Sequence, residues 1–274
     1  MNPLQLIYQG DTKVPVEIEG VLPERVAEMS LAEIEAIEIF HGNRKVPLRE
    51  FFTIEGDPTS ETMELKGDLT GVHWIGAKMT RGRIHVAGNA GRHVGSEMAG
   101  GEIHVEGDAG DWVGGEMKGG RIQVRGRAGH LIGAAYRGSR WGMTGGTILI
   151  GGDVGNEIGH TMRRGLLAVG GNIGDLAGFN MIAGTILVFG DSGIRHGAGM
   201  HRGTIGLLGA ERPEMLPTFG FACRYFPQIF HLLFAELKRL DFAVPQELIG
   251  AQLDLFYGDL IEGGRGEIFT RATS

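Results

Sequence analysis

The sequence has few of the residues and segments on which several kinds of protein depend. One cysteine, Cys223, among 274 residues excludes a disulfide framework and any cluster held by several thiolates. No run reaches 18 apolar residues, and the first residues carry no signal-peptide pattern. The net charge of −7 argues against a nucleic-acid footprint. We therefore expect a cytoplasmic chain that binds neither a membrane nor a nucleic acid.

The familiar catalytic patterns are missing as well. The sequence contains no H-E-x-x-H, no G-x-S-x-G, no Walker sequence and no zinc-binding spacing of cysteine and histidine. Its glycines occasionally imitate a dinucleotide fingerprint, but they lie outside any βαβ unit. We expect neither a catalytic residue nor a metal ligand on this chain.

Glycine, in contrast, is abundant and regularly spaced. The frame G-x-x-G-x-x-x-G-x-x-M-x-x-G begins at Gly88 and recurs 19 residues later at Gly107. Seven such units hold 28 of the 49 glycines and 7 of the 11 methionines. The unit beginning at Gly126 carries seven additional residues between Gly133 and Met143. A fixed period of about 20 residues indicates a solenoid whose units are buried by stacking on one another.

Each unit ends in a short strand with alternating apolar residues. Arg83-Ile84-His85-Val86 is the first, and its isoleucine and valine both point inward because side chains alternate along a strand. The methionines fill the core, and the four glycines supply corners with positive φ and room for close backbone approach. The fold class is therefore mainly β: a right-handed parallel β-helix of about seven coils over residues 66–210.

The outward positions of these strands change character along the chain. From the first unit to the last they are His85, His104, Gln123, Leu149, Ala168, Leu187 and Gly206. The apolar stripe over the last four units must be covered, either by the chain's own terminus or by another protein.

The two ends of the chain predict caps. Residues 1–65 form a small α/β cap, in which Ser30 and Glu33 make a capping box that opens a helix over Leu31–Phe40. Residues 211–274 form a helix over Pro227–Leu240, followed by a glycine-rich tail that packs on the solenoid. The helix is also a candidate cover for the apolar stripe.

An Asp or Asn follows the first glycine of most units. These residues are Asp68, Asn89, Asp108, Asp153, Asn172 and Asp191. Turn chemistry explains them better than a calcium site, because Asx side chains tolerate left-handed backbone and cap local amides.

Three further details make the chain resemble one family. They are the cap ending His41-Gly42-Asn43-Arg44, the insertion Tyr136–Trp141, and the tail from Tyr257-Gly258-Asp259 to Gly266-Glu267-Ile268. Together with the glycine–methionine frame, they resemble the C subunit of formylmethanofuran dehydrogenase. A more distant similarity is to the C-terminal β-helix of the glutamate synthase large subunit.

The resemblance implies a part in one-carbon metabolism. In one branch of the family, archaeal tungsten or molybdenum complexes reduce carbon dioxide to formylmethanofuran. In the other, found in methylotrophic bacteria that oxidise formaldehyde, a formyltransferase/hydrolase complex moves formyl from tetrahydromethanopterin to a methanofuran-type carrier and releases formate. The excess of arginine over lysine, 20 to 6, favours the bacterial branch. The resemblance implies a structural subunit among an amidohydrolase-like A subunit, a B subunit and a formyltransferase D subunit.

The resemblance also implies a polyglutamate tail on the carrier, for which a basic track would be suited. Basic residues lie just before the last glycine of several units and on the insertion. We call them the basic track: Lys118, Arg137, Arg140, Arg163, Arg164, His201 and Arg202. The carrier belongs to the complex, and we expect this chain alone to bind no cofactor. The alternative is that these side chains pair with acidic groups of partner subunits or are merely solvated.

Two other functions stay open at this point. A free-standing β-helix enzyme acting on polysaccharide would need a groove of clustered carboxylates and aromatic platforms. A glutamate-synthase-like domain is the other.

Overall fold

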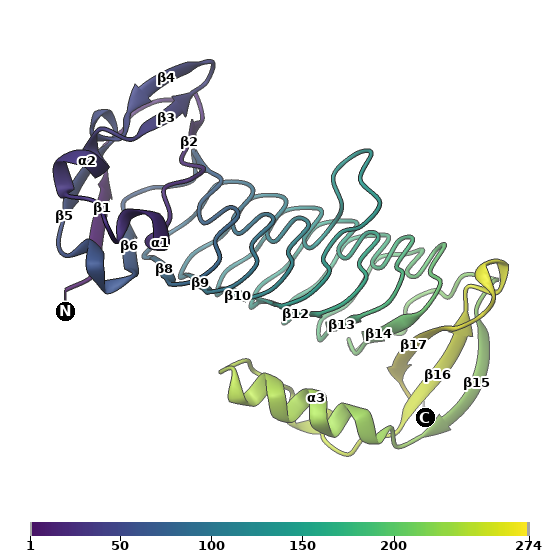
Figure 1. Cartoon of the computed structure of the whole chain (residues 1–274). Coiled ribbons are helices and arrows are strands. Elements are labelled where there is room, and N and C mark those ends of the chain that lie inside the picture. The colour runs from purple at the N-terminus through teal and green to yellow at the C-terminus, as the bar shows by residue number, and fades with distance from the viewer. Residues whose placement is uncertain (1, 273–274) are drawn as a thin grey trace.

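A computed structural model describes residues 2–272 of the chain. The molecule is elongated (Figure 1): coils stack along one axis, the N-terminal elements lie at one end, and the C-terminal strands lie at the other. The sheet that runs through it has 13 strands, in the order β15-β16-β17-β14-β13-β12-β11-β10-β9-β8-β6-β1-β5. Most neighbouring pairs in this sheet are parallel.

The N-terminal elements extend this sheet and add a second, four-stranded one. Strand β1 (Leu4–Tyr8) lies between β5 (Phe52–Glu55) and β6 (Thr62–Lys66). The second sheet has the order β4-β3-β2-β7, with β4 at Arg44–Pro47, β3 at Glu38–His41, β2 at Val16–Glu17 and β7 at Val72–His73. The short helices are α1 (Pro23–Val26) and α2 (Leu31–Glu35), with 3-10 turns at Leu48–Glu50 and Pro58–Ser60.

The predicted helix over Leu31–Phe40 is correct at its start and wrong at its end. The capping box is present, because Ser30 Oγ accepts a hydrogen bond from the Glu33 amide and the Glu33 carboxylate accepts one from the Ser30 amide. The helix ends at Glu35, and Glu38–His41 pairs instead with Arg44–Pro47 as an antiparallel strand. Burial of the β-branched Ile39 in that sheet outweighs the helical pattern of the segment Leu31–Phe40.

The seven repeats form seven coils, each contributing one strand to the large sheet, as the sequence predicts. Each strand pairs in parallel with its equivalent in the next coil, so that Ile84 lies beside Ile103 and Ile103 beside Ile122. A second ladder of single bridges, such as Leu69 with Ala90 and Ala90 with Ala109, joins the coils on another face. The strands are β8 (Arg83–Val86), β9 (Glu102–Val105), β10 (Arg121–Val124), β11 (Thr147–Ile150), β12 (Leu166–Val169), β13 (Thr185–Val188) and β14 (Gly203–Leu207).

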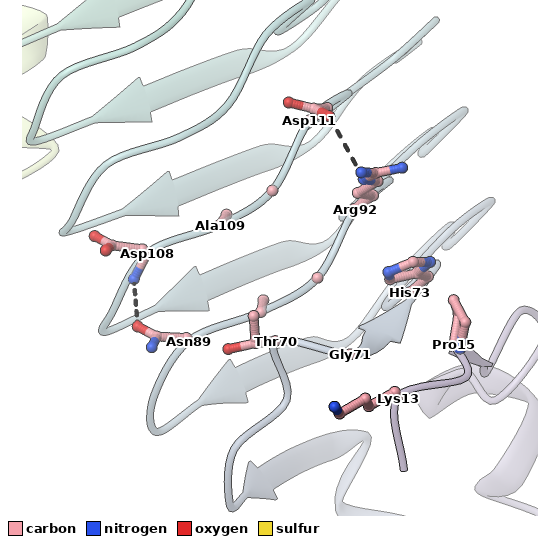
Figure 2. Close-up of a pocket in the computed structure, with 13 residues that line it drawn as sticks. Lys13, Pro15, Thr70, Gly71, His73, Asn89, Arg92, Asp108, Ala109 and Asp111 are labelled. Atoms are coloured by element: carbon pink, nitrogen blue, oxygen red, sulfur yellow. Dashed lines mark hydrogen bonds and ion pairs between the residues drawn. The ribbon is translucent and has the colours of Figure 1, made fainter.

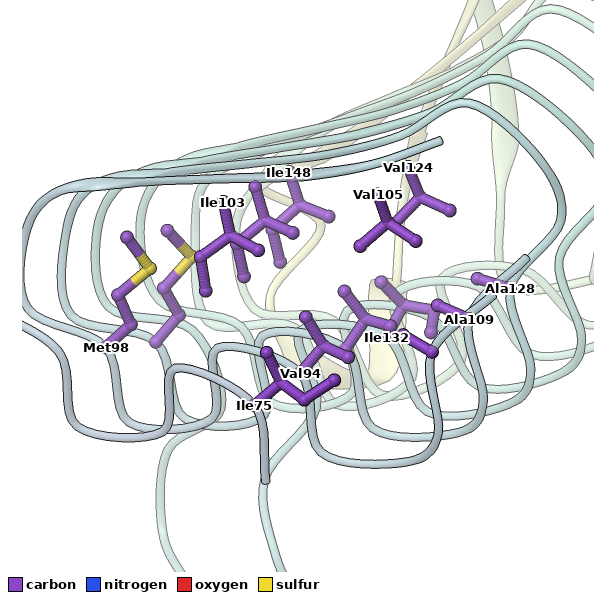
Figure 3. Close-up of a cluster of buried hydrophobic side chains, with 14 of the residues drawn as sticks. Ile75, Val94, Met98, Ile103, Val105, Ala109, Val124, Ala128, Ile132 and Ile148 are labelled. Carbon is purple, nitrogen blue, oxygen red and sulfur yellow. The ribbon is translucent and has the colours of Figure 1, made fainter. Parts of the chain in front are cut away.

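The interior of the coils is filled by columns of equivalent side chains (Figure 3). Ile103, Val105 and Met98 of one coil all point into the same core and are fully or almost fully buried. The methionine column from Met79 to Met200 is buried throughout, which confirms its prediction as core filler.

Only two of the four glycines in a typical unit are corners with positive φ. In the unit beginning at Gly88, these are Gly95 (φ 63°) and Gly101 (φ 84°). Gly91 is required for a different reason: a Cβ there would clash with the carbonyl oxygen of Val72 in the preceding coil. The expectation that these glycines supply corners with positive φ and room for close backbone approach is therefore confirmed, with the two roles falling on different glycines.

Asp68 caps its own turn, because its Oδ1 accepts a hydrogen bond from the Thr70 amide at 3.1 Å. The other Asx residues act between coils: Asn89 Oδ1 accepts a hydrogen bond from the Asp108 amide at 2.9 Å, and Asp108 Oδ1 accepts one from the Arg127 amide at 2.7 Å. The left-handed conformation falls on other residues of the coils, such as His93. The prediction of local amide capping is correct for Asp68, and for the others the capped amide lies one coil away. These carboxylates are thus engaged with backbone, which removes support from a sugar-cleaving groove.

Helix α3 (Gln228–Arg239) runs along the side of the coils and covers the apolar stripe (Figure 1). Phe230, Phe234 and Leu237 of the helix share one buried cluster with Leu149 and Leu187. This confirms the first alternative, a cover supplied by the chain's own terminus. The stripe is therefore not a surface for another protein, and α3 does not close an end of the solenoid.

Strands from the tail close the C-terminal end instead. Strand β17 (Gly266–Arg271) pairs in parallel with β14, and β16 (Leu253–Gly258) pairs with β17 and with β15 (Gly220–Tyr225). A 3-10 turn at Gln246–Leu248 precedes β16, and another at Leu260–Glu262 lies between β16 and β17. The tail packs on the coils as expected, but it does so as two strands.

Candidate functional site

The insertion in the fourth coil forms one wall of a basic hollow. Residues 137–141 are exposed, on the loop that stands away from the coils in Figure 1. Trp141 at its end faces Arg163 of the next coil, whose guanidinium carbon lies 4.9 Å from the centre of the indole ring. The hollow has a volume of about 680 Å³, and Arg164 and Arg202 also line it.

This hollow holds no acidic residue among those that line it. Within the described residues 2–272, no carboxylate lies within ion-pair distance of Arg163, Arg164 or Arg202. Three uncompensated guanidinium groups in a chain of net charge −7 create a local positive field, and they present planar forks suited to carboxylate or phosphate. We call Trp141, Arg163, Arg164 and Arg202 the basic hollow.

The other members of the basic track are placed differently. Lys118 lies 3.9 Å from Glu97 Oε2, and His201 Nδ1 lies 3.3 Å from Glu262 Oε2. Arg137 and Arg140 lie on the exposed loop. The structure thus brings together three of the seven residues in one hollow. Trp141 was missed as a site residue, although its place at the end of an insertion beside predicted arginines was a usable signal.

A column of aromatic rings anchors the root of the loop. Trp74, His93 and Trp112 occupy equivalent positions in three coils, and the rings of Trp74 and His93 stack at 4.0 Å. Tyr136, the first residue of the insertion, stacks on Trp112 at 4.7 Å. The amide of Tyr136 also donates to Glu116 Oε1 at 3.0 Å. The loop therefore leaves the coils from a fixed point.

Hydrogen bonds at this root have one consistent direction. Ser96 Oγ donates to the Trp112 carbonyl oxygen at 3.2 Å, because a carbonyl can only accept. The single proton of Tyr136 is then donated to Ser96 Oγ at 2.7 Å, and Tyr136 Oη accepts from His93 Nδ1 at 3.1 Å. His93 is therefore assigned as the neutral tautomer with its proton on Nδ1.

The pKa values agree with this neutral chain of hydrogen bonds. Burial, helped by the nearby His73 and Arg92, lowers the pKa of His93 from its ordinary 6.5 to about 4. Burial is also the main cause that raises the pKa of Tyr136 to about 12. His93 and Tyr136 therefore both stay uncharged near neutral pH.

A second hollow lies where the N-terminal segment meets the first coils, and Figure 2 shows its lining. Its volume is about 580 Å³, with Lys13 and Pro15 on one side and His73, Arg92 and Asp111 on the other. Arg92 Nε lies 3.5 Å from Asp111 Oδ2, and burial followed by the charge of Arg92 lowers the pKa of His73. Because the charges of Arg92 and Asp111 partly compensate each other, the lining of this hollow is less positive than that of the basic hollow.

Comparison with known proteins relates the chain to one family and to one solved complex. Residues 68–215, which include all seven coils, match the family described as GXGXG motif. Over 98% of its length, the chain is 33% identical to a chain of the formyltransferase/hydrolase complex (FhcABCD) from Methylorubrum extorquens, solved in complex with methylofuran. That chain is covered completely, and the TM-score is 0.91.

Curated relatives point the same way. The chain is 41% identical over 95 residues to the C subunit of tungsten-containing formylmethanofuran dehydrogenase 2 from Methanococcus maripaludis. It is 40% identical over 87 residues to the C subunit of molybdenum-containing formylmethanofuran dehydrogenase 1 from Methanothermobacter thermautotrophicus. The chain belongs to the GXGXG-motif family of formylmethanofuran dehydrogenase C subunits.

The extent of these matches differs. The similarity to the two curated C subunits covers 34% and 31% of this chain, and 35% and 22% of the relatives' own lengths. The likeness to the chain of the Methylorubrum complex covers 98% of this chain and all of that one. Within residues 2–272 of this C-subunit homologue, no helix is long and apolar enough to cross a membrane. The same residues contain no group of three His, Cys, Asp or Glu side chains that could hold a metal ion.

Proposed function

We propose that the chain is a non-catalytic, structural subunit of a cytoplasmic formyltransferase/hydrolase complex. Its sister subunits would be an amidohydrolase-like A subunit, a B subunit and a formyltransferase D subunit. The complex would move formyl from tetrahydromethanopterin to a methanofuran-type carrier and release formate. The observation that carries the proposal is the full-length likeness, at 33% identity and a TM-score of 0.91, to a chain of such a complex. The in-register stacking of parallel strands supports the right-handed β-helix predicted from the repeat.

The extent of the likeness favours the bacterial type of complex. The match to the Methylorubrum chain covers 98% of this chain, whereas the matches to the tungsten- and molybdenum-containing relatives cover about a third of it. An archaeal complex that reduces carbon dioxide is therefore the second choice.

We further propose that the basic hollow contacts the anionic tail of the carrier. Arg163, Arg164 and Arg202 offer guanidinium groups without a carboxylate partner, and the indole ring of Trp141 packs against the guanidinium of Arg163. Each exposed contact with a carboxylate contributes at most about 1 kcal/mol, so a tail held by several of them would be bound moderately and could still move.

The test of the function is assembly. The chain is tagged and co-expressed with the sister subunits from the same organism, and the purified material is analysed by size and composition. We expect one large assembly that contains this chain and its sisters. Recovery of the tagged chain alone, with the sisters assembled without it, would refute the proposal.

The test of the carrier contact is a pair of charge-matched variants. Arg163→Ala with Arg164→Ala removes two charges from the hollow, and Arg44→Ala with Arg49→Ala removes two exposed charges from the N-terminal cap. At up to about 1 kcal/mol per contact, the first pair should weaken carrier affinity roughly tenfold. The second pair should leave the affinity unchanged. Unaltered turnover and carrier affinity in the first pair would exclude the contact.

A further inference from the structure

The strand at the C-terminal end of the large sheet has an open edge. Among the described residues 2–272, strand β15 pairs with β16 alone, so its other edge has no strand partner there. All six of its residues are exposed, and Arg224, its only charged residue, lies 2.6 Å from the carboxylate of Asp254, which it shares with Arg212. Monomeric proteins protect such edges with charges, proline or a covering segment. In residues 2–272 this edge has no proline and no covering strand, and its one charged side chain is paired with β16; a register shift near Phe221 is its remaining protection. It therefore has the form of a site for an added strand.

Apolar side chains continue from this edge onto helix α3. Tyr225 ends the strand and Phe226 follows it, and Ile229 and Leu232 lie on the outer side of the helix, opposite the buried Phe230. Spacing of three residues places Ile229 and Leu232 on one face of α3. Phe221 lies on the other face of the sheet, because it pairs with Phe256 whereas Tyr225 pairs with Leu253. We call Tyr225, Phe226, Ile229 and Leu232 the end surface.

The size of the end surface is that of an interface. Its four side chains are between 38% and 69% exposed. At roughly 200 Å² for each large apolar side chain, they expose about 400 Å² together. Patches of this size on a monomer are commonly functional. With the backbone edge of β15 added, a partner would bury a large part of the roughly 800 Å² per side of a standard interface.

The irregularity of β15 bears on which partner is suitable. The strand shifts register between Phe221 and Cys223, at its centre. Two copies related by a twofold axis would place both irregular centres opposite each other, where a bulge twists the strand and interrupts pairing. If a regular strand of a different polypeptide pairs with β15, only one of the two paired strands is irregular. A different polypeptide is therefore a more suitable partner than a second copy.

We infer that a sister subunit adds an extended strand to β15 and covers Ile229 and Leu232 of α3 with apolar side chains. The inference rests on the proposed function, because the full-length neighbour is a chain of a multi-subunit complex. It goes further by naming the face that docks, which lies at the C-terminal end of the coils and away from the insertion.

The experiment compares two double variants during co-expression with the sister subunits. Ile229→Asp with Leu232→Asp places two charges on the end surface without touching the buried face of α3. Val14→Asp with Phe40→Asp makes the same change at two N-terminal residues of matching exposure, 45% and 43%. The amount of each sister subunit recovered with the tagged chain is measured. Melting and size of each isolated variant show that it is folded.

We expect the end-surface variant to recover at least tenfold less of one sister subunit, while the wild-type chain and the control variant recover it fully. Full recovery by the end-surface variant would overturn the inference while leaving the proposed function intact. Failure of the wild-type chain to recover any sister would refute both. A wild-type chain that is a dimer by itself, and a monomer when Ile229 and Leu232 are replaced, would assign the end surface to a second copy and overturn the inference.

A second measurement tests strand addition directly. Amide hydrogen exchange of residues 220–225 is followed in the isolated chain and in the assembly. An added strand should slow exchange at the outward-facing amides of β15 by at least tenfold. Unchanged exchange across the strand would contradict strand addition even if the docking variants behave as expected.

Discussion

Replacement of Phe234 by alanine should release helix α3 from the coils. Phe234 is almost fully buried, and its ring packs 5.9 Å from Phe189 of the coils and 5.5 Å from Phe230 of the helix. Removal of a buried phenylalanine side chain costs about 3–5 kcal/mol, including the cavity that it leaves. Because α3 lies on the outside of the coils and forms none of them, we expect this loss to fall on docking of the helix rather than on stacking of the coils.

Limited trypsin digestion under native conditions measures that docking. Lys238 and Arg239 in the last turn of α3 become cleavable when the helix opens, and the cleavage rate follows the population of the open form. A loss of about 3 kcal/mol raises that population more than 100-fold, since each 1.4 kcal/mol is a factor of ten. Leu232→Ala changes an exposed residue of the same helix, and its effect should stay within about 0.5 kcal/mol.

Equal cleavage rates in Phe234→Ala and Leu232→Ala would refute the reasoning. They would mean that α3 is not held by the apolar stripe. Simultaneous digestion of the coils with α3 would also contradict it, because the helix would then be part of one cooperative unit with the solenoid.

Three further outcomes follow from the geometry of the coils. Gly95→Ala should lower the free energy of unfolding by about 2–4 kcal/mol, because its φ is positive and a Cβ would clash with the core. Gly88→Ala has neither problem and should change that free energy little. Chemical denaturation of both variants measures the difference. Asp108→Ala should cost about 1 kcal/mol by leaving the Arg127 amide unbonded, and Asp108→Asn should restore the loss, which thermal melting can show. Because the pKa of His93 is lowered to about 4 in the folded chain, the unfolded chain takes up this proton first as the pH is lowered below about 6.5. The free energy of unfolding should therefore decrease as the pH falls from about 6.5 to about 4. His93→Gln should flatten the dependence of that free energy on pH in this range.

The repeat made much of the fold predictable. A fixed spacing of glycine and methionine determines which residues face inward in every coil, so the seven strands and their register could be read from one unit. Ser30 and Glu33 revealed the start of α2 for a similar reason: the capping signal lies entirely within four residues.

Features that depend on residues far apart in the chain were harder to predict. The end of α2 depends on pairing of Glu38–His41 with a later strand. The partner of the Asp108 side chain is an amide 19 residues away, which local turn chemistry could not reveal. The cover of the apolar stripe was one of two alternatives, because nothing in the sequence places α3 beside β11–β13.

The basic hollow was predictable only in part. Arg163, Arg164 and Arg202 precede the last glycines of their units, and equivalent positions stack. Lys118 and His201 have the same spacing, but they lie beside Glu97 and Glu262, and these neighbours become visible only in three dimensions. Trp141 joins the hollow because the loop from Tyr136 is anchored at its root by stacking on Trp112.

The most direct test of the account is the activity of the complex with and without this chain. Sister subunits and the chain are purified separately and together, and formyl transfer with formate release is measured in each sample. The account predicts an inert isolated chain and full turnover only in the assembly that contains it. Turnover by the isolated chain, or undiminished turnover by sister subunits that lack it, would contradict the account.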